Sequence, residues 1–177
     1  MSTDIPAPDS FRFDLAAESI TLKIRWFGVC IGFALVNLIS NEALSPGEPR
    51  SVPILNVLLA IGAVYATVDT AMSLRGRVFL SDWPIGVSLL ESIFIGLLCY
   101  FDADQESAFR FYYFLSVVVC AIRHPPAVTS GSFLLHAASY SALTLALPQS
   151  SFLPWIITIV SIGWVTWAST RLAGLVR

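Results

Sequence analysis

Four polar side chains inside otherwise apolar segments are the residues of this sequence that could do chemistry. Glu91 lies in the middle of VSLLESIFIGLLCY, and His136, Asp69 and Asn37 interrupt three other apolar runs. An ionisable side chain in such a setting is costly, so it usually faces the interior of a helix bundle and finds a partner there. We therefore take these four residues as the candidate polar and sensing site.

Glu91 and His136 are predicted to lie at the same depth in the molecule. Glu91 comes eight residues after Trp83, which corresponds to roughly 12 Å along a helix. His136 comes nine residues after Ala127, roughly 14 Å along a helix that runs in the same direction. The sequence therefore predicts a hydrogen bond or an ion pair between the two side chains. Such a pair could hold two helices together or sense a signal, and the residues favour neither role.

Asp69 lies closer to the end of its apolar segment than Glu91 does. Arg75 or Arg77 could reach back to neutralise its carboxylate. Tyr65 and Ser73 share its helix face at positions i−4 and i+4. We interpret Asp69 as half of an interior salt bridge in preference to a functional acid.

The spacing of possible ligands does not support metal or haem chemistry. Twelve helical residues would separate His124 from His136 by about 18 Å, and the HPP sequence interrupts the helix, so the two cannot ligate one haem. Cys30, Cys99 and Cys120 are dispersed in apolar segments without CxxC spacing, which predicts buried, reduced side chains. No Walker loop, HExxH or GxSxG sequence is present. We predict no cofactor, no metal site and no catalytic residue.

The composition defines the surroundings of these residues. Of the 177 residues, 56% are apolar and 12% are charged, whereas soluble domains have roughly 25% charged residues. About 20 apolar residues can cross the roughly 30 Å hydrocarbon core of a bilayer, and turn or charge clusters separate six such segments here. We predict an all-α, polytopic six-helix transmembrane bundle with spans at residues 24–41, 53–73, 83–101, 108–123, 127–146 and 154–174.

The chain divides into two predicted parts. Residues 1–23 form a cytoplasmic or interfacial N-terminal segment, in which Asp14 is the expected N-cap of a helix that continues into the first span. Residues 24–177 form the transmembrane domain. Within it, the tight RHPP break predicts a hairpin of the fourth and fifth spans. Small residues at 130–132 and 137–139 predict a face for close helix packing.

The distribution of Lys and Arg predicts the orientation of the bundle. Only Arg50 and Arg110 fall on one side, and eight basic residues fall on the other. The larger group comprises Arg12, Lys23, Arg25, Arg75, Arg77, Arg123, Arg171 and Arg177. We therefore expect both termini in the cytoplasm and the acidic loops on the outer side.

Three stretches resemble a known family. The Arg25–Trp26 pair in LKIRWFGVCIGFALV stands at the start of the first span, and VYATVDTAMSLRGR ends the second span in a basic turn. GLLCYFDADQESAFRFYYFLSVVVCAIR joins the third span to an aromatic-rich fourth span. Over residues 20–175 this pattern is similar to the six-helix N-terminal membrane module of bacterial sensor histidine kinases. The resemblance implies a multi-pass signalling protein of the bacterial cytoplasmic (inner) membrane.

The sequence departs from the redox-responsive members of that family at two places. Their outer loop after the third span resembles Gly-Gly-x-x-Asn-Pro-Phe and is implicated in quinone sensing, whereas the stretch here is DADQESAF, and only Phe109 matches. Quinone sensing by that motif is therefore not expected. The sequence given also ends at STRLAGLVR without a phosphoacceptor His box or an ATP-binding domain. The chain is either the membrane part of a longer kinase or a relative without a kinase.

These observations leave two functions from different classes. The first is a non-enzymatic sensor, in which the charge state around Glu91 and His136 biases a small helix shift that the last span carries to a cytoplasmic output. The alternative is a structural accessory subunit of a larger, energy-transducing membrane complex. A transporter would need a longer polar pathway than these residues provide. The expected partners are membrane lipids, with lipid or quinone contact, and a homodimer or larger complex, and no nucleic acid.

Overall fold

The chain folds into six helices in the computed structural model, which describes residues 8–39, 51–75, 77, 83–102, 107–147 and 151–176. All regular structure within these residues is helical, which confirms the all-α prediction there. The helices are α1 (Pro8–Ala34, continued by a π-turn at Leu35–Ile39), α2 (Val52–Leu74), α3 (Pro84–Phe101), α4 (Phe111–Arg123, preceded by a 3-10 turn at Ala108–Arg110), α5 (Pro126–Ala146) and α6 (Phe152–Val176).

Prolines set several of the helix boundaries. Pro84 and Pro126 are the first residues of α3 and α5, where the missing N–H of proline costs no hydrogen bond. Pro125 disfavours helical geometry at the residue before it, and His124 is indeed extended, so α4 ends at Arg123. The helical hairpin predicted at the RHPP break is therefore confirmed as α4 and α5, at the level of helices.

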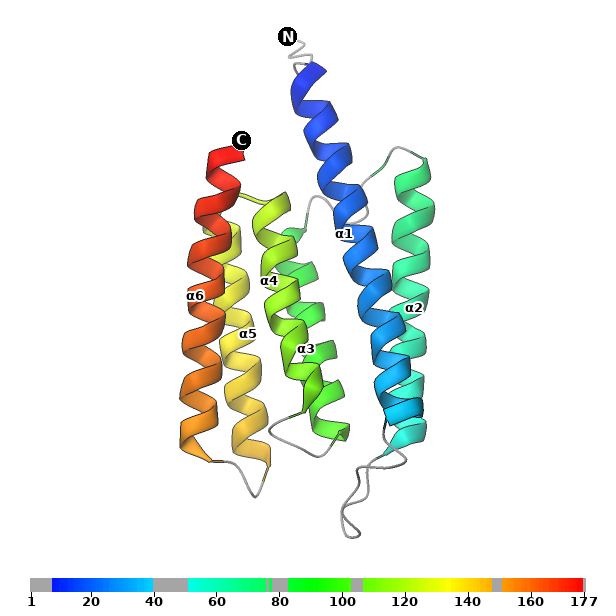
Figure 1. Cartoon of the computed structure of the whole chain (residues 1–177), viewed down its shortest axis with the longest axis vertical. Helices are drawn as coiled ribbons and strands as arrows, with labels where there is room; N and C mark the ends of the chain where they lie inside the picture. The colour runs from blue at the N-terminus through cyan, green and yellow to red at the C-terminus, as the bar shows by residue number, and fades with distance from the viewer. Residues whose placement is uncertain are drawn as a thin grey trace.

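Figure 1 shows the helices alternating in direction, so that both ends of the described chain lie at the same end of the bundle. α4 occupies the centre, because it contacts α1, α3, α5 and α6. α3 packs on α2 and α5 as well as on α4, and α1 packs on α2. This arrangement brings side chains from α1 to α5 to the interior around α4.

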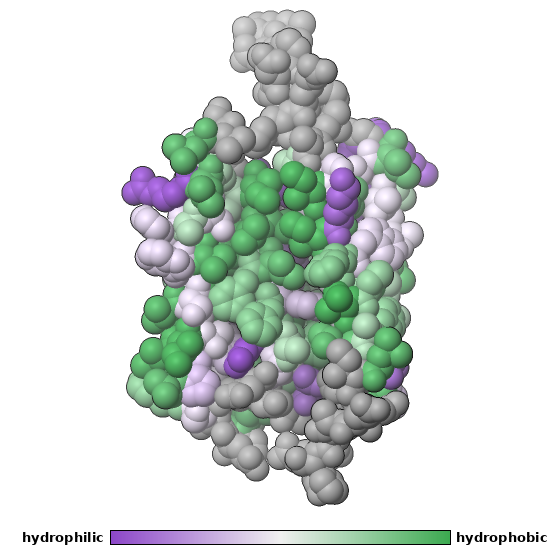
Figure 2. All heavy atoms as spheres, in the orientation of Figure 1, coloured by the Kyte–Doolittle hydropathy of each residue, from purple (hydrophilic) through white to green (hydrophobic). Residues whose placement is uncertain are grey.

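Four helices are long and apolar enough to cross a membrane, by length and composition: Ala17–Leu38, Val52–Leu74, Pro84–Phe101 and Phe152–Leu175. Figure 2 shows apolar side chains over most of the described part of one outer face. The expectation of a membrane protein is supported at this level. The other two helices differ from these four, since α4 has 13 residues and α5 carries several Ser and Thr side chains along its 21 residues.

The core is built around α4 from aromatic and aliphatic side chains. Phe109, Tyr113 and Tyr140 are fully buried, and the Tyr113 and Tyr140 rings form a T-shaped pair. α3 and α5 approach closely, since a methyl group added at Gly96 would lie 2.9 Å from Ser139 Oγ. The small-residue face predicted on the fifth span is confirmed at this contact.

Two expectations about local structure are wrong. α1 begins at Pro8, so Asp14 is an interior helical residue and not an N-cap. α1 passes residue 23 without a break, as expected for a helix that continues into the first span, and Glu18 and Thr21 are buried. Cys99 and Cys120 are buried as expected, but Cys30 is exposed on the outer side of α1. The acidic loop residues Glu42, Glu48, Asp104 and Glu106 lie outside the described residues.

Candidate functional site

Arg25 joins three helices through two carboxylates. From α1, its Nη1 binds Asp69 Oδ2 on α2, and its Nη2 lies 3.0 Å from Glu91 Oε1 on α3. The guanidinium also lies over the Tyr65 ring, 4.9 Å from the ring centroid, in the geometry of a cation–π contact. The cation that neutralises Asp69 is therefore Arg25, and the expectation of Arg75 or Arg77 in that role is wrong.

Glu91 and His136 are connected through a serine and not directly. Ser116 on α4 donates to Glu91 Oε2, and its oxygen lies 2.9 Å from His136 Nε2. The other ring nitrogen, Nδ1, contacts Ser92 Oγ on α3. The prediction that Glu91 and His136 lie at the same depth in the bundle agrees with this arrangement. The predicted direct pair is replaced by a hydrogen-bonded relay, Glu91–Ser116–His136, that joins α3, α4 and α5.

The Arg25 cluster holds two acidic side chains and one basic side chain. With both carboxylates ionised, one guanidinium (+1) faces two carboxylates (−2), which leaves a net charge of −1. Asp69 is fully buried, and its Oδ1 has no hydrogen-bond partner among the described residues. Glu91 is more accessible, with 23% of its side chain exposed. Glu91 is thus the acid through which the cluster can meet a ligand.

A second buried ion pair lies near the first. Arg123, the last residue of α4, binds Glu18 on α1 at 2.9 Å, and Glu18 is 2% exposed. Neither residue was predicted as part of the site, because Glu18 belongs to the segment expected at the membrane surface. The pattern that could have revealed it is a carboxylate on the same helix face as Arg25, seven residues earlier.

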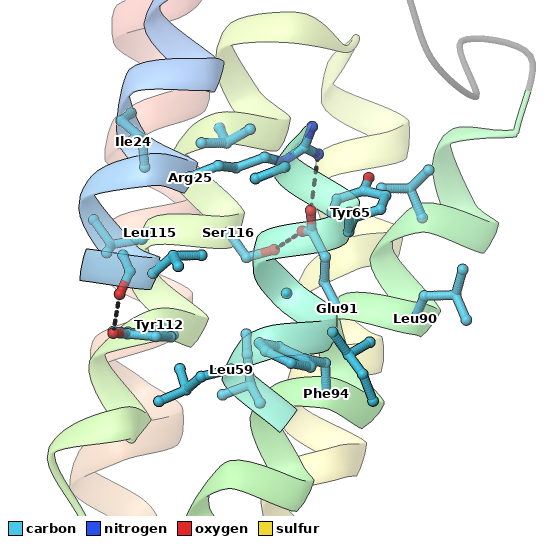
Figure 3. A pocket seen from close by; sticks show the side chains of 18 residues that line it. Ile24, Arg25, Leu59, Tyr65, Leu90, Glu91, Phe94, Tyr112, Leu115 and Ser116 are labelled. Atoms are coloured by element: carbon cyan, nitrogen blue, oxygen red, sulfur yellow. Dashed lines mark hydrogen bonds and ion pairs between the residues drawn. The ribbon is translucent and has the colours of Figure 1, made fainter. Parts of the chain in front are cut away.

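A cavity of about 320 Å³ lies beside the Arg25 cluster and is lined by α1, α2, α3 and α4. Figure 3 shows Arg25, Glu91 and Ser116 at one end of it, and Leu59 and Phe94 at the other. Gly28 gives the cavity room, because a Cβ atom added there would meet no other atom within 4 Å. The cavity therefore has a charged end and an apolar body.

Asn37 is not part of this cluster. It lies in the π-turn after α1, and its side-chain amide exchanges two hydrogen bonds with that of Asn56 on α2, at 2.9 and 3.0 Å. The structure thus brings together Asp69, Glu91 and His136 through Arg25 and Ser116, and pairs Asn37 elsewhere along the bundle.

The side chains of the site are hydrogen-bonding and ionic groups. Within the part of the chain that the structure describes, no three His, Cys, Asp or Glu side chains are grouped so that they could hold a metal ion. Comparisons with protein-family models, with curated proteins and with solved structures find no match to this chain.

Proposed function

We propose that this chain is a non-enzymatic membrane sensor module. The observation that carries the proposal is the Glu91–Ser116–His136 relay, which links the cavity to helices on its far side. In the proposal, a ligand or a charge change at the Glu91 carboxylate moves or neutralises the group that accepts the Ser116 hydrogen bond. The Ser116 hydroxyl must then reorient, and the contact with His136 on α5 changes with it.

Contacts between α5 and α6 carry the change to the end of the chain. Thr158 on α6 donates to the Tyr140 hydroxyl at 3.3 Å, and Trp155 Nε1 donates to Ser141 Oγ at 3.0 Å. α4 packs on α6 as well. A small displacement of two packed helices against a third is an established type of switching motion in proteins. In the proposal, α6 passes this displacement to a cytoplasmic output.

The proposal includes six membrane spans, with both termini in the cytoplasm of a bacterium and the bundle in its cytoplasmic membrane. Its support is that both described ends lie at one end of the bundle, where α2 and α6 also end (Figure 1). Arg75 is the C-cap of α2, and Arg171 lies in the last quarter of α6. The similarity to the membrane module of sensor histidine kinases, noted from the sequence, belongs to the same proposal. So does a homodimeric assembly.

Spin-label distances across the bundle test the signalling step. In a Cys30→Ser background, one label at Leu74→Cys and one at Leu175→Cys would report the separation of the ends of α2 and α6. Both of these leucines are more than 80% exposed. We expect Ser116→Ala, which interrupts the relay, to shift or broaden the distance distribution. Ser130→Ala, an exposed serine on α5, is the matched control.

The outcome decides the proposal. A distribution that Ser116→Ala leaves identical to that of the Ser130→Ala control means that the relay does not set the position of α6, and the sensor mechanism is then rejected.

A specific observation favours the second candidate, an accessory subunit of a larger membrane complex. Trp164 and Trp167 form a tilted ring pair on α6 with centroids 5.0 Å apart, and both side chains are at least half exposed. Trp164 lies 12 residues into a 25-residue helix, whereas indoles facing lipid prefer the two membrane surfaces. Disulfide crosslinking from Trp164→Cys in native membranes distinguishes a second copy of this chain from a different subunit by the mass of the product.

A further inference from the structure

We infer that the cavity between α1, α2, α3 and α4 binds a lipophilic organic cation, that is, an amphiphile with one ammonium group and an apolar body. The inference rests on the proposed function in one respect: the sensor mechanism says what binding of the cation would cause. The binding itself is argued from the charge, the lining and the shape of the cavity. Three observations carry it.

The first observation is the charge at the polar end. Both terminal nitrogens of Arg25 already bind carboxylates, Nη1 that of Asp69 and Nη2 that of Glu91. An anionic ligand would have to displace one of these carboxylates and would join a cluster in which one guanidinium already faces two carboxylates. A cation meets the opposite situation, because its ammonium N–H groups can donate to the partly exposed Glu91 carboxylate. In surroundings of low polarity, the electrostatic energy that distinguishes a cationic from an anionic ligand is larger than in water.

The second observation is the lining below the charged end. Leu59, Phe94 and Ile95 provide an apolar body, and the rings of Tyr65 and Tyr112 also face the cavity. Aromatic faces attract alkylammonium groups. Tyr112 donates its hydroxyl to the Gly28 carbonyl at 2.6 Å, which fixes the ring at the wall (Figure 3). The lining thus suits an apolar chain or ring that carries a cationic head.

The third observation is the shape. A volume of about 320 Å³ is at the lower end of the range for small-molecule sites, which is about 300–1,000 Å³. At Gly28, an added Cβ atom would point into empty space. At Gly62, an added Cβ atom would lie only 2.9 Å from the Phe94 ring, so the absence of a side chain at Gly62 makes room for that ring. The cavity is partly open to the outer surface, where the exposed Ile61 and Leu90 line it, so a ligand can enter from that side. A lipid chain could fill the apolar body but would bring no cation to the Glu91 carboxylate.

Binding would act on the relay described above. The ammonium group and Arg25 compete for the same carboxylate, Glu91, while Arg25 keeps its contact with Asp69. Since Ser116 donates to the other oxygen of Glu91, movement of this carboxylate changes the Ser116–His136 contact. The ligand would in this way bias α4 and α5.

Three probes with one apolar chain and different heads test the charge preference: decylamine, decanol and decanoate. The protein is placed in phosphatidylcholine nanodiscs, and the half-saturating concentration of each probe is read from the rise in thermal melting temperature. A charge-assisted hydrogen bond predicts about tenfold tighter binding of decylamine than of decanol. Decanoate should bind most weakly. In Glu91→Gln the preference for decylamine over decanol should disappear.

A matched pair of glycine variants tests the location. Gly28→Leu places a large apolar side chain in the cavity without replacing any charged residue, and it should abolish the response to all three probes. Gly174→Leu makes the same substitution at a helical glycine on α6 that is equally open, and it should leave the responses unchanged. Because Gly28→Leu leaves Arg25, Asp69 and Glu91 in the sequence, it tests the location of the site even if Glu91→Gln fails to fold.

Several results would overturn the inference. Equal binding of decanol and decylamine assigns the cavity to a lipid chain, tighter binding of decanoate reverses the charge argument, and an unchanged response in Gly28→Leu places the site elsewhere. The spin labels at positions 74 and 175 in the same nanodiscs separate the two proposals. Selective binding of decylamine without a distance change rejects the sensor mechanism alone. A relay that controls α6 without selective binding rejects the cation site alone.

Discussion

Glu91 and His136 lie on different helices and are held together by a third residue, the Ser116 hydroxyl, which donates to Glu91 Oε2 and lies 2.9 Å from His136 Nε2. The interaction of the acid with the imidazole is therefore indirect, and its strength depends on a side chain from α4. This relationship distinguishes a relay from an ion pair, and it can be measured.

A double-mutant cycle between Glu91→Gln and His136→Ala should give a coupling free energy of about 0.5–2 kcal/mol. The same cycle in a Ser116→Ala background should give none, because the connecting hydroxyl is gone. The free energy of unfolding, measured by denaturant titration in micelles, provides the four corners of each cycle. Coupling of equal size with and without Ser116 would mean that the two residues interact by another route.

Replacement of Arg25 by Met should destabilise the protein by about 3–5 kcal/mol, because it leaves two carboxylates in the interior without their cation. Addition of Asp69→Asn and Glu91→Gln to Arg25→Met should recover more than half of the loss. Arg75→Met, at the end of α2, is the control and should change the free energy of unfolding by less than about 0.5 kcal/mol. If Arg75→Met costs as much as Arg25→Met, the assignment of Arg25 as the interior cation is wrong.

The reciprocal amide pair of Asn37 and Asn56 predicts a rescue by a second substitution. Asn37→Leu alone leaves the Asn56 amide without its partner and should cost about 1–2 kcal/mol. The double variant with Asn56→Leu should be close to the wild type in its free energy of unfolding, since both polar groups are then absent. A double variant whose loss equals the sum of the two single losses would show that the amides do not depend on each other.

Two glycine substitutions should have opposite effects on stability. In Gly96→Ala the new methyl group meets Ser139 Oγ at 2.9 Å, so α3 and α5 must separate, at a cost of about 1–3 kcal/mol. In Gly174→Ala the methyl group meets nothing within 4 Å, and the better helix propensity of Ala should stabilise the protein by up to about 1 kcal/mol. Thermal melting in nanodiscs measures both, and a neutral Gly96→Ala would contradict close packing of these helices.

The helices and the shared depth of Glu91 and His136 along the bundle could be predicted from the sequence. The side chains that bind these two residues could not. A constant rise per residue placed Glu91 and His136 at one depth, and the break at Pro125 and Pro126 predicted the α4–α5 hairpin. Ser116 gives no such signal, because one serine in an apolar helix is common and its orientation depends on how α4 packs.

Arg25 shows why the cation of the site was assigned wrongly. Counting basic residues treats an arginine near the start of an apolar run as a surface charge. α1 begins at Pro8, well before the apolar run, so Arg25 lies inside the bundle and faces carboxylates 44 and 66 residues further along the chain. Contacts over such separations follow from tertiary packing and leave no local pattern.

If the bundle lies in a membrane as proposed, the length of α4 has a consequence for the response of the protein to bilayer thickness. Its 13 residues extend over about 20 Å, which is shorter than a hydrocarbon core of roughly 30 Å. α4 contacts four other helices, so the mismatch falls on its protein neighbours and not mainly on lipid. A thicker bilayer acts on the longer outer helices by changing their tilt. The outer helices would then slide against α4, whose own tilt is fixed by its protein neighbours. One of the sliding contacts is the hydrogen bond from Tyr112 on α4 to the Gly28 carbonyl of α1.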